Sequence, residues 1–141
     1  MTQADPYDLQ RFLDAQAPVY EQVLRELRAG QKTSHWMWFI FPQIAGLGHS
    51  SMAQRFAISG RAEAESYLQH PVLGPRLTEC TRLVNHQEGR AIEDILGDID
   101  GLKFRSSMTL FAKVAANNQT FIEAIEKFYG GIFDELTVAK L

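Results

Sequence analysis

One short segment, residues 32–43, gathers most of the residue types that could bind or transform a small molecule. It reads Lys-Thr-Ser-His-Trp-Met-Trp-Phe-Ile-Phe-Pro-Gln. If a helix begins at Ser34, the unpaired N–H groups of its first turn favour an anion, and Lys32 adds a positive charge beside them. His35 is the candidate acid–base group, because imidazole titrates near neutral pH. The segment therefore indicates either a binding site for a phosphate or a carboxylate, or an ordinary capped helix with a solvated lysine beside it.

The same segment is apolar on every side of the expected helix. Trp36, Trp38, Phe39 and Phe41 lie within six residues and include both tryptophans of the chain. A surface helix keeps a polar side, so these residues form a buried core helix, line a cavity or face a partner. In the cavity interpretation Trp36 or Trp38 stacks on a ring of the ligand, and Gln43 completes the polar frame.

A second group of polar residues is Lys103, Ser106 and Ser107. On a helix these residues share one face, because they are three and four positions apart. Phe104 and Met108 occupy the other face. The polar face could bind an anion, or a serine could act as a nucleophile with the lysine lowering the effective pKa of its hydroxyl. The alternative is an ordinary solvent-facing side of a helix.

Two functions follow from these groups. The first is binding of a small anionic ligand that carries a ring, such as a nucleotide, in a pocket lined by residues 35–43 and by the Lys103 face, with metal-independent hydrolysis or group transfer as the reaction. This pocket requires Lys103 to converge with Lys32 and His35. The second is a protein-interaction or homodimerisation module without catalysis, which requires an exposed aromatic surface around Trp38 and Phe41.

The elements that position these residues are predicted to be helices. Apolar residues recur at spacings of three and four, proline and glycine separate the runs, and the alternation typical of strands is absent. We predict an all-α fold, with residues 1–141 forming a single compact domain of many short helices in an orthogonal-type bundle. In the first half of the chain we expect one helix after Asp5, one from Pro18 to Gly30, one from Ser34 to before Pro42, and one that begins at Ser50 or Ser51 and contains Met52, Phe56 and Ile58. Two more are expected over Ala62–Gln69 and along the stripe Leu73, Leu77, Cys80 and Val84. The last four are expected over Ala91–Leu96, from Asp100 or Gly101 onward, from Asn118 to Gly130, and from Asp134 onward. The turn Gly46–Leu47–Gly48 is either a flap over a neighbouring site or a plain turn.

Charge and hydropathy exclude several classes of function. The 14 basic residues against 17 acidic residues give a net charge of -3. Because the basic residues are spread singly, we expect no nucleic-acid partner. The longest apolar run, Trp36–Phe41, is far too short to cross a bilayer, so we expect no membrane partner. The oligomeric state stays open.

Cysteine and histidine usage limits redox and metal chemistry. Cys80 is the only cysteine and lies on an apolar helical stripe, so we expect a buried, unreactive thiol and no intrachain disulfide. The four histidines lack metal-ligand spacing, so no metal and no cofactor are predicted. With an amino terminus that lacks the pattern of a secretory signal, these features predict a cytoplasmic protein.

Three stretches of the chain resemble one uncharacterised bacterial family, domain of unknown function 1810. They are KTSHWMWFIFPQIAGLGHSSMAQRFAI, YLQHPVLGPRLTEC and KFRSSMTLF, and the likeness runs from about Leu9 to Leu141. The resemblance implies an all-helical single domain. It implies no activity and no catalytic residue. Some relatives bear the label calpastatin, but calpain inhibitors of that name are long, repetitive and largely disordered, unlike this short aromatic-rich chain.

Overall fold

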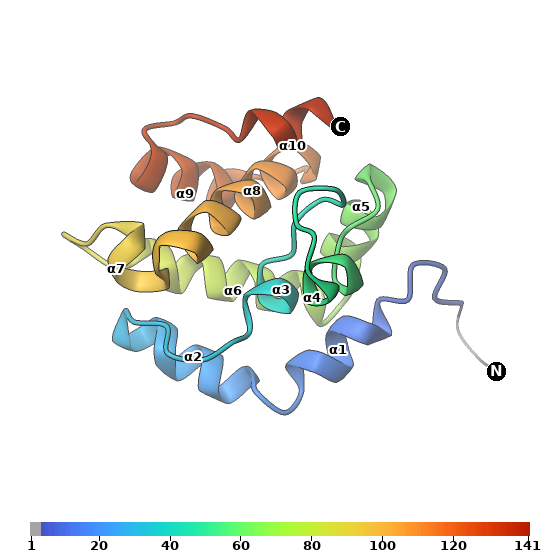
Figure 1. Ribbon diagram of the computed structural model, residues 1–141, viewed down its shortest axis with the longest axis horizontal. Coiled ribbons are helices and arrows are strands. Elements are labelled where there is room, and N and C mark those ends of the chain that lie inside the picture. The colour runs from blue at the N-terminus through green and yellow to red at the C-terminus, as the bar shows by residue number, and fades with distance from the viewer. Residues whose placement is uncertain (1–3) are drawn as a thin grey trace.

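The computed structural model describes residues 4–141, and this part of the chain contains ten helices (Figure 1). They are α1 (Gln10–Gln16), α2 (Tyr20–Ala29), α3 (Met37–Ile40), α4 (Ser51–Arg55), α5 (Arg61–Gln69), α6 (Leu73–Asn85), α7 (Ile92–Leu96), α8 (Asp98–Val114), α9 (Gln119–Tyr129) and α10 (Glu135–Ala139). The extended pairing within this range is one isolated parallel bridge, between Ile44 and Ile58. The prediction of an all-α single domain is confirmed.

Helix α6 runs through the middle of the molecule and packs against α2, α5 and α9 (Figure 1). Helix α8 lies on one side of α6 and packs against α9, α7 and α10 (Figure 1). Helices α1 and α2 lie on the other side of α6 (Figure 1). No helix in the described part of the chain is both long enough and apolar enough to cross a membrane.

The aromatic segment lies inside the core that these helices enclose. Trp36 and Phe41 are each only 1% exposed, and Phe39 is also buried. Phe41 meets the ring of Phe104 from α8 edge to face, with centroids 4.9 Å apart, a favourable aromatic geometry. Trp38 is the exception, because it is only half-buried. The core interpretation of this segment is therefore correct, and the expected exposed aromatic surface at Phe41 is wrong.

Local capping signals place several helix ends where the sequence predicts them. The Ser50 side chain accepts from the Ala53 N–H at the start of α4, and Asp134 caps α10 through Thr137. Gly30 ends α2 in the left-handed region, with φ of 72°, a conformation that a residue with a Cβ rarely adopts.

Four expected helix boundaries are wrong. The helix expected directly after Asp5 begins only at Gln10. Helix α3 spans only Met37–Ile40 and is not capped by Ser34, because the Ser34 hydroxyl donates to a carboxylate of α2 instead. Helix α4 ends at Arg55, before Ile58, whose backbone pairs with the chain near Ile44. Helix α8 begins at Asp98, two or three residues before the expected start at Asp100 or Gly101.

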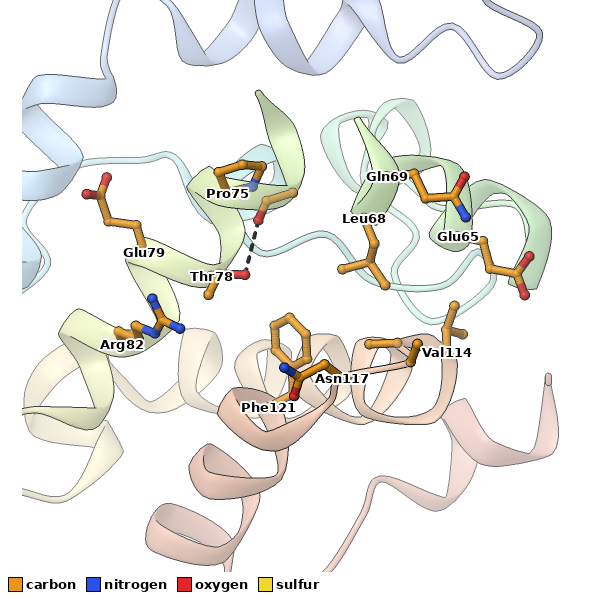
Figure 2. Close-up of a pocket in the computed structure, with 13 residues that line it drawn as sticks. Glu65, Leu68, Gln69, Pro75, Thr78, Glu79, Arg82, Val114, Asn117 and Phe121 are labelled. Carbon is orange, nitrogen blue, oxygen red and sulfur yellow. Dashed lines mark hydrogen bonds between the residues drawn. The ribbon is translucent and has the colours of Figure 1, made fainter. Parts of the chain in front are cut away.

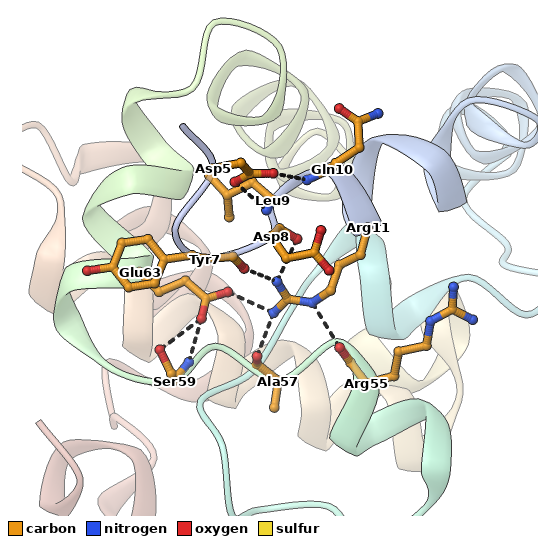
Figure 3. A network of polar contacts seen from close by, with 10 residues as sticks. All are labelled: Asp5, Tyr7, Asp8, Leu9, Gln10, Arg11, Arg55, Ala57, Ser59 and Glu63. Carbon is orange, nitrogen blue, oxygen red and sulfur yellow. Dashed lines mark hydrogen bonds and ion pairs between the residues drawn. The ribbon is translucent and has the colours of Figure 1, made fainter. Parts of the chain in front are cut away.

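The guanidinium of Arg11 ties α1 to the segment that leads into α5 (Figure 3). It donates to Glu63 at 2.7 Å and to the backbone carbonyls of Tyr7, Asp8, Arg55 and Ala57. Glu63 also accepts from the N–H and the hydroxyl of Ser59. Glu63 is thus a buried structural partner, although its helical position suggests a solvated side chain.

Candidate functional site

A carboxylate of the chain itself binds the backbone N–H groups at the start of the expected anion site. Glu26, a buried residue of α2, accepts from the N–H of Thr33 at 2.7 Å and from the N–H of Ser34 at 3.0 Å. It also accepts from the Ser34 hydroxyl, from the Trp36 indole N–H at 3.0 Å and from the Gln22 amide. An internal carboxylate thus lies beside Ser34, and it binds the N–H groups that precede α3 rather than those of a first helical turn starting at Ser34.

These hydrogen bonds hold Glu26 in its charged form. Burial alone raises the pKa of a carboxyl group, because it penalises the charge. Here the donors, led by the Ser34 hydroxyl and the Thr33 N–H, outweigh burial and lower the pKa of Glu26 from 4.5 to about 2. Sequence reasoning missed Glu26. The available signal was a charged residue three positions after Val23, on the apolar face of its helix.

Lys32 and Lys103 converge on a second carboxylate, that of Asp100. The Nζ of Lys32 lies 2.8 Å from one Asp100 oxygen, and the Nζ of Lys103 lies 3.9 Å from the other. Each ammonium also lies over an indole ring, Lys32 5.0 Å from the Trp36 centroid and Lys103 5.1 Å from the Trp38 centroid. Because the shorter contact belongs to Lys32, Lys103 keeps more of its charge available to a ligand.

A groove of about 370 Å³ lies between the segment 43–48, α8 and α10. Three of the predicted site residues line it, namely Gln43, Lys103 and Ser106. Leu47 and Gly48 also line the groove. They belong to the turn that the sequence predicts to be either a flap over a site or a plain turn. The other lining residues are Ile99, Leu102, Arg105, Asp134 and Leu136.

Most polar groups of this groove are committed to the fold. The Ser106 hydroxyl donates to Asp134 at 3.0 Å, and the Arg105 guanidinium donates to the carbonyls of Ile132 and Phe133. Lys103 and Gln43 are the polar side chains there that have no hydrogen bond within residues 4–141. The groove is thus an apolar surface with one available cation and one available amide.

The remaining predicted site residues lie outside the groove. Ser34 and Trp36 surround Glu26, and His35 is exposed and does not line the groove. Ser107 is fully buried, and its hydroxyl has no hydrogen-bond partner in the described part of the chain. The buried indole N–H of Trp38 is also unpartnered there. The structure therefore does not assemble the full predicted pocket.

A larger cleft, of about 820 Å³, lies between α5, α6 and the connection from α8 to α9 (Figure 2). Leu68, Val114 and Phe121 form its apolar centre, and Glu65 and Arg82 lie on opposite sides of it (Figure 2). Sequence reasoning missed this cleft, since its walls come from three separate segments and Glu65 resembles an ordinary solvated residue.

Cys80 does not line this cleft and is not accessible. It is fully buried on α6, and burial raises the pKa of its thiol to about 12. A thiol that stays protonated is a poor nucleophile. Within residues 4–141 there is also no cluster of three or more histidine, cysteine, aspartate or glutamate side chains that could hold a metal ion.

The chain belongs to the family described as "Protein of unknown function (DUF1810)", whose model matches residues 6–141. It is similar to the conserved hypothetical protein Rv1873 from Mycobacterium tuberculosis, a crystal structure with 58% sequence identity and a TM-score of 0.96. That likeness covers 97% of this chain and 98% of the other. No curated protein matches the chain.

Proposed function

We propose that this protein binds a small ligand that joins a ring or another apolar body to an anionic group, and that the ligand lies in the groove between the segment 43–48, α8 and α10. The observation that carries the proposal is the ammonium of Lys103 beside apolar side chains, in a groove whose Arg105, Ser106 and Asp134 are bound within the fold. Binding pockets for small molecules are commonly of this kind, mostly apolar with a few polar groups that orient the ligand.

The groove offers a distinct contact to each part of such a ligand. Ile99, Leu102 and Leu136 present apolar side chains that are 70%, 67% and 66% exposed. Covering them removes apolar surface from water, which is favourable. Lys103 then pairs with the anionic group, and the Gln43 amide donates to it or accepts from a ring substituent. Since His35, the candidate acid–base group, does not line the groove, the proposal is limited to binding. The proposed location is the cytoplasm, because a chain with a single buried thiol suits a reducing compartment.

A second candidate function is an interaction with another protein through the same surface. The exposure of Ile99, Leu102 and Leu136 favours it, because contiguous exposed apolar side chains often mark protein interfaces. This surface replaces the aromatic one expected around Trp38 and Phe41.

A fluorescence titration with 8-anilinonaphthalene-1-sulfonate tests the first function, since this probe is a ring-bearing anion. We expect Lys103→Gln to weaken binding about tenfold, the effect of losing one charge-assisted contact. Leu102→Ser should weaken it by a similar factor. Lys113→Gln is the matched control, because Lys113 is an exposed cation of the same helix that does not line the groove. The uncharged probe N-phenyl-1-naphthylamine should bind Lys103→Gln and the wild type alike.

Equal affinity of Lys103→Gln and Lys113→Gln for the anionic probe would refute the ligand proposal. Sedimentation velocity on the same variants tests the second function. A wild type that self-associates, together with a monomeric Leu102→Ser variant, would identify the surface as a contact between copies of the chain.

A further inference from the structure

We propose a second binding site in the cleft between α5, α6 and the α8–α9 connection, and we infer that it takes a short peptide with free ends. The ammonium of the peptide would pair with Glu65, its carboxylate with Arg82, and a central apolar side chain would rest on Leu68 and Phe121. None of these residues belongs to the Lys103 groove.

The charges of Glu65 and Arg82 have no partner in the part of the chain that the structure describes. Neither the Glu65 carboxylate nor the Arg82 guanidinium has a hydrogen bond or an ion pair within residues 4–141. Glu79, the other acidic residue of the lining, accepts from the Tyr20 hydroxyl at 2.6 Å, and Figure 2 shows its carboxylate turned to the far side of α6 from the apolar centre. The cleft therefore offers one free cation on one wall and one free anion on the other.

The dipole of helix α8 favours the same orientation of the peptide, with its ammonium group at Glu65. Helix α8 has 17 residues and ends at Val114, and Figure 2 shows Val114 next to Glu65. The carboxyl end of a helix carries partial negative charge, which attracts a cation. The Glu65 side of the cleft is thus the side that suits an ammonium group, and the Arg82 side suits a carboxylate.

The size and the neutral polar groups of the cleft fit a peptide. A cube with the 820 Å³ volume of the cleft is about 9 Å on each side, similar to the roughly 10 Å that an extended tripeptide spans. A single amino acid carries both charges on one carbon, so it cannot reach both walls. The amide side chains of Gln69 and Asn117 line the same cleft, and each can both donate to and accept from a peptide group.

Amide chemical shifts of the labelled protein, titrated with the tripeptide Gly-Leu-Gly, test this site. We expect shifts at the cleft residues Thr78 and Asn117 with a Kd of about 1 mM, typical of a small flexible ligand held by a few contacts. Arg82→Gln and Glu65→Gln should each weaken binding about tenfold. Both side chains are exposed and unbonded, so the variants should fold like the wild type.

Matched controls and capped peptides complete the experiment. Arg28→Gln and Glu21→Gln remove the same charges from exposed positions of α2, away from the cleft, and should leave the Kd unchanged. Acetylating the amino end should reproduce the loss seen with Glu65→Gln, and amidating the carboxyl end should reproduce the loss seen with Arg82→Gln. A capped peptide that binds as tightly as the free one would overturn the proposal. So would a loss from only one cap, or an absence of cleft shifts at about 10 mM tripeptide, which is well above the expected Kd.

Discussion

Replacing Glu26 by glutamine removes one buried charge while it keeps the shape of the side chain. The Oε1 atom accepts from the N–H groups of Thr33 and Ser34 and from the indole of Trp36. A glutamine oxygen placed there retains these three bonds in weaker, uncharged form. Its NH2 group then faces the Gln22 amide, which also donates. We therefore expect the variant to fold but to be less stable.

The pKa of Glu26 sets the size of the effect. Folding lowers this pKa from 4.5 to about 2, and each pKa unit corresponds to about 1.4 kcal/mol. Because the folded-state pKa is the lower one, the stabilisation is fully present above pH 4.5 and is lost as the pH falls toward 2. We expect Glu26→Gln to lower the free energy of unfolding by about 3 kcal/mol at pH 7 and by only about 1.5 kcal/mol at pH 3.

Urea denaturation followed by circular dichroism at the two pH values measures this difference. Circular dichroism is preferable to tryptophan fluorescence, since Trp36 contacts the substituted residue. Glu21→Gln is the matched control, because Glu21 is an exposed carboxylate of the same helix, and it should change stability by less than about 0.5 kcal/mol. A Glu26→Gln deficit that is the same at both pH values would refute the assignment of its cause to the bound carboxylate.

Three further outcomes follow from the buried polar groups. Arg11→Ala should lower the free energy of unfolding by about 3 kcal/mol, measured by urea denaturation, because it leaves Glu63 buried without its cation; an unchanged midpoint would contradict this. Cys80 should react with 5,5′-dithiobis(2-nitrobenzoate) only when the protein unfolds, since the thiol is buried and its pKa is raised to about 12; rapid reaction of the native protein would show that it is accessible. Ser107→Ala should leave the melting temperature unchanged or raise it, because the hydroxyl is buried without a partner, whereas Ser106→Ala should lower the free energy of unfolding by about 1 kcal/mol, and equal effects of the two substitutions would be inconsistent with these contacts.

The features that the sequence predicts well depend on neighbouring residues. Ser50 and Asp134 cap the helices that follow them, and Gly30 ends α2 in the left-handed region. In each case the bond or the conformation involves residues within one helical turn, so composition and spacing contain the information. The same holds for the core position of Trp36 and Phe41, because a segment with no polar side has to be covered.

The partners of charged groups depend on tertiary contacts instead. Lys32 pairs with Asp100, which is 68 positions further along the chain, and no spacing rule relates the two. The anion near Ser34 comes from Glu26, on a helix that precedes it. The sequence indicates that N–H donors near Ser34 require an anion, but it does not reveal whether a ligand or the protein itself supplies it.

This distinction determines where a ligand can bind. The segment 32–43 has the most suggestive residue types, yet several of its donors are already bound within the protein, namely the N–H groups of Thr33 and Ser34, the Trp36 indole and the Lys32 ammonium. A ligand that used them would have to displace Glu26 or Asp100 from short, charge-assisted contacts. Groups without such partners offer a ligand a contact at lower cost, since no internal bond is broken. In the described part of the chain such groups are Arg82 and Glu65, beside the apolar surface of the cleft. Lys103 in the groove has only a longer contact, 3.9 Å, to Asp100. Unpaired or weakly paired charge next to exposed apolar surface, rather than aromatic density, therefore identifies the two candidate sites of this fold.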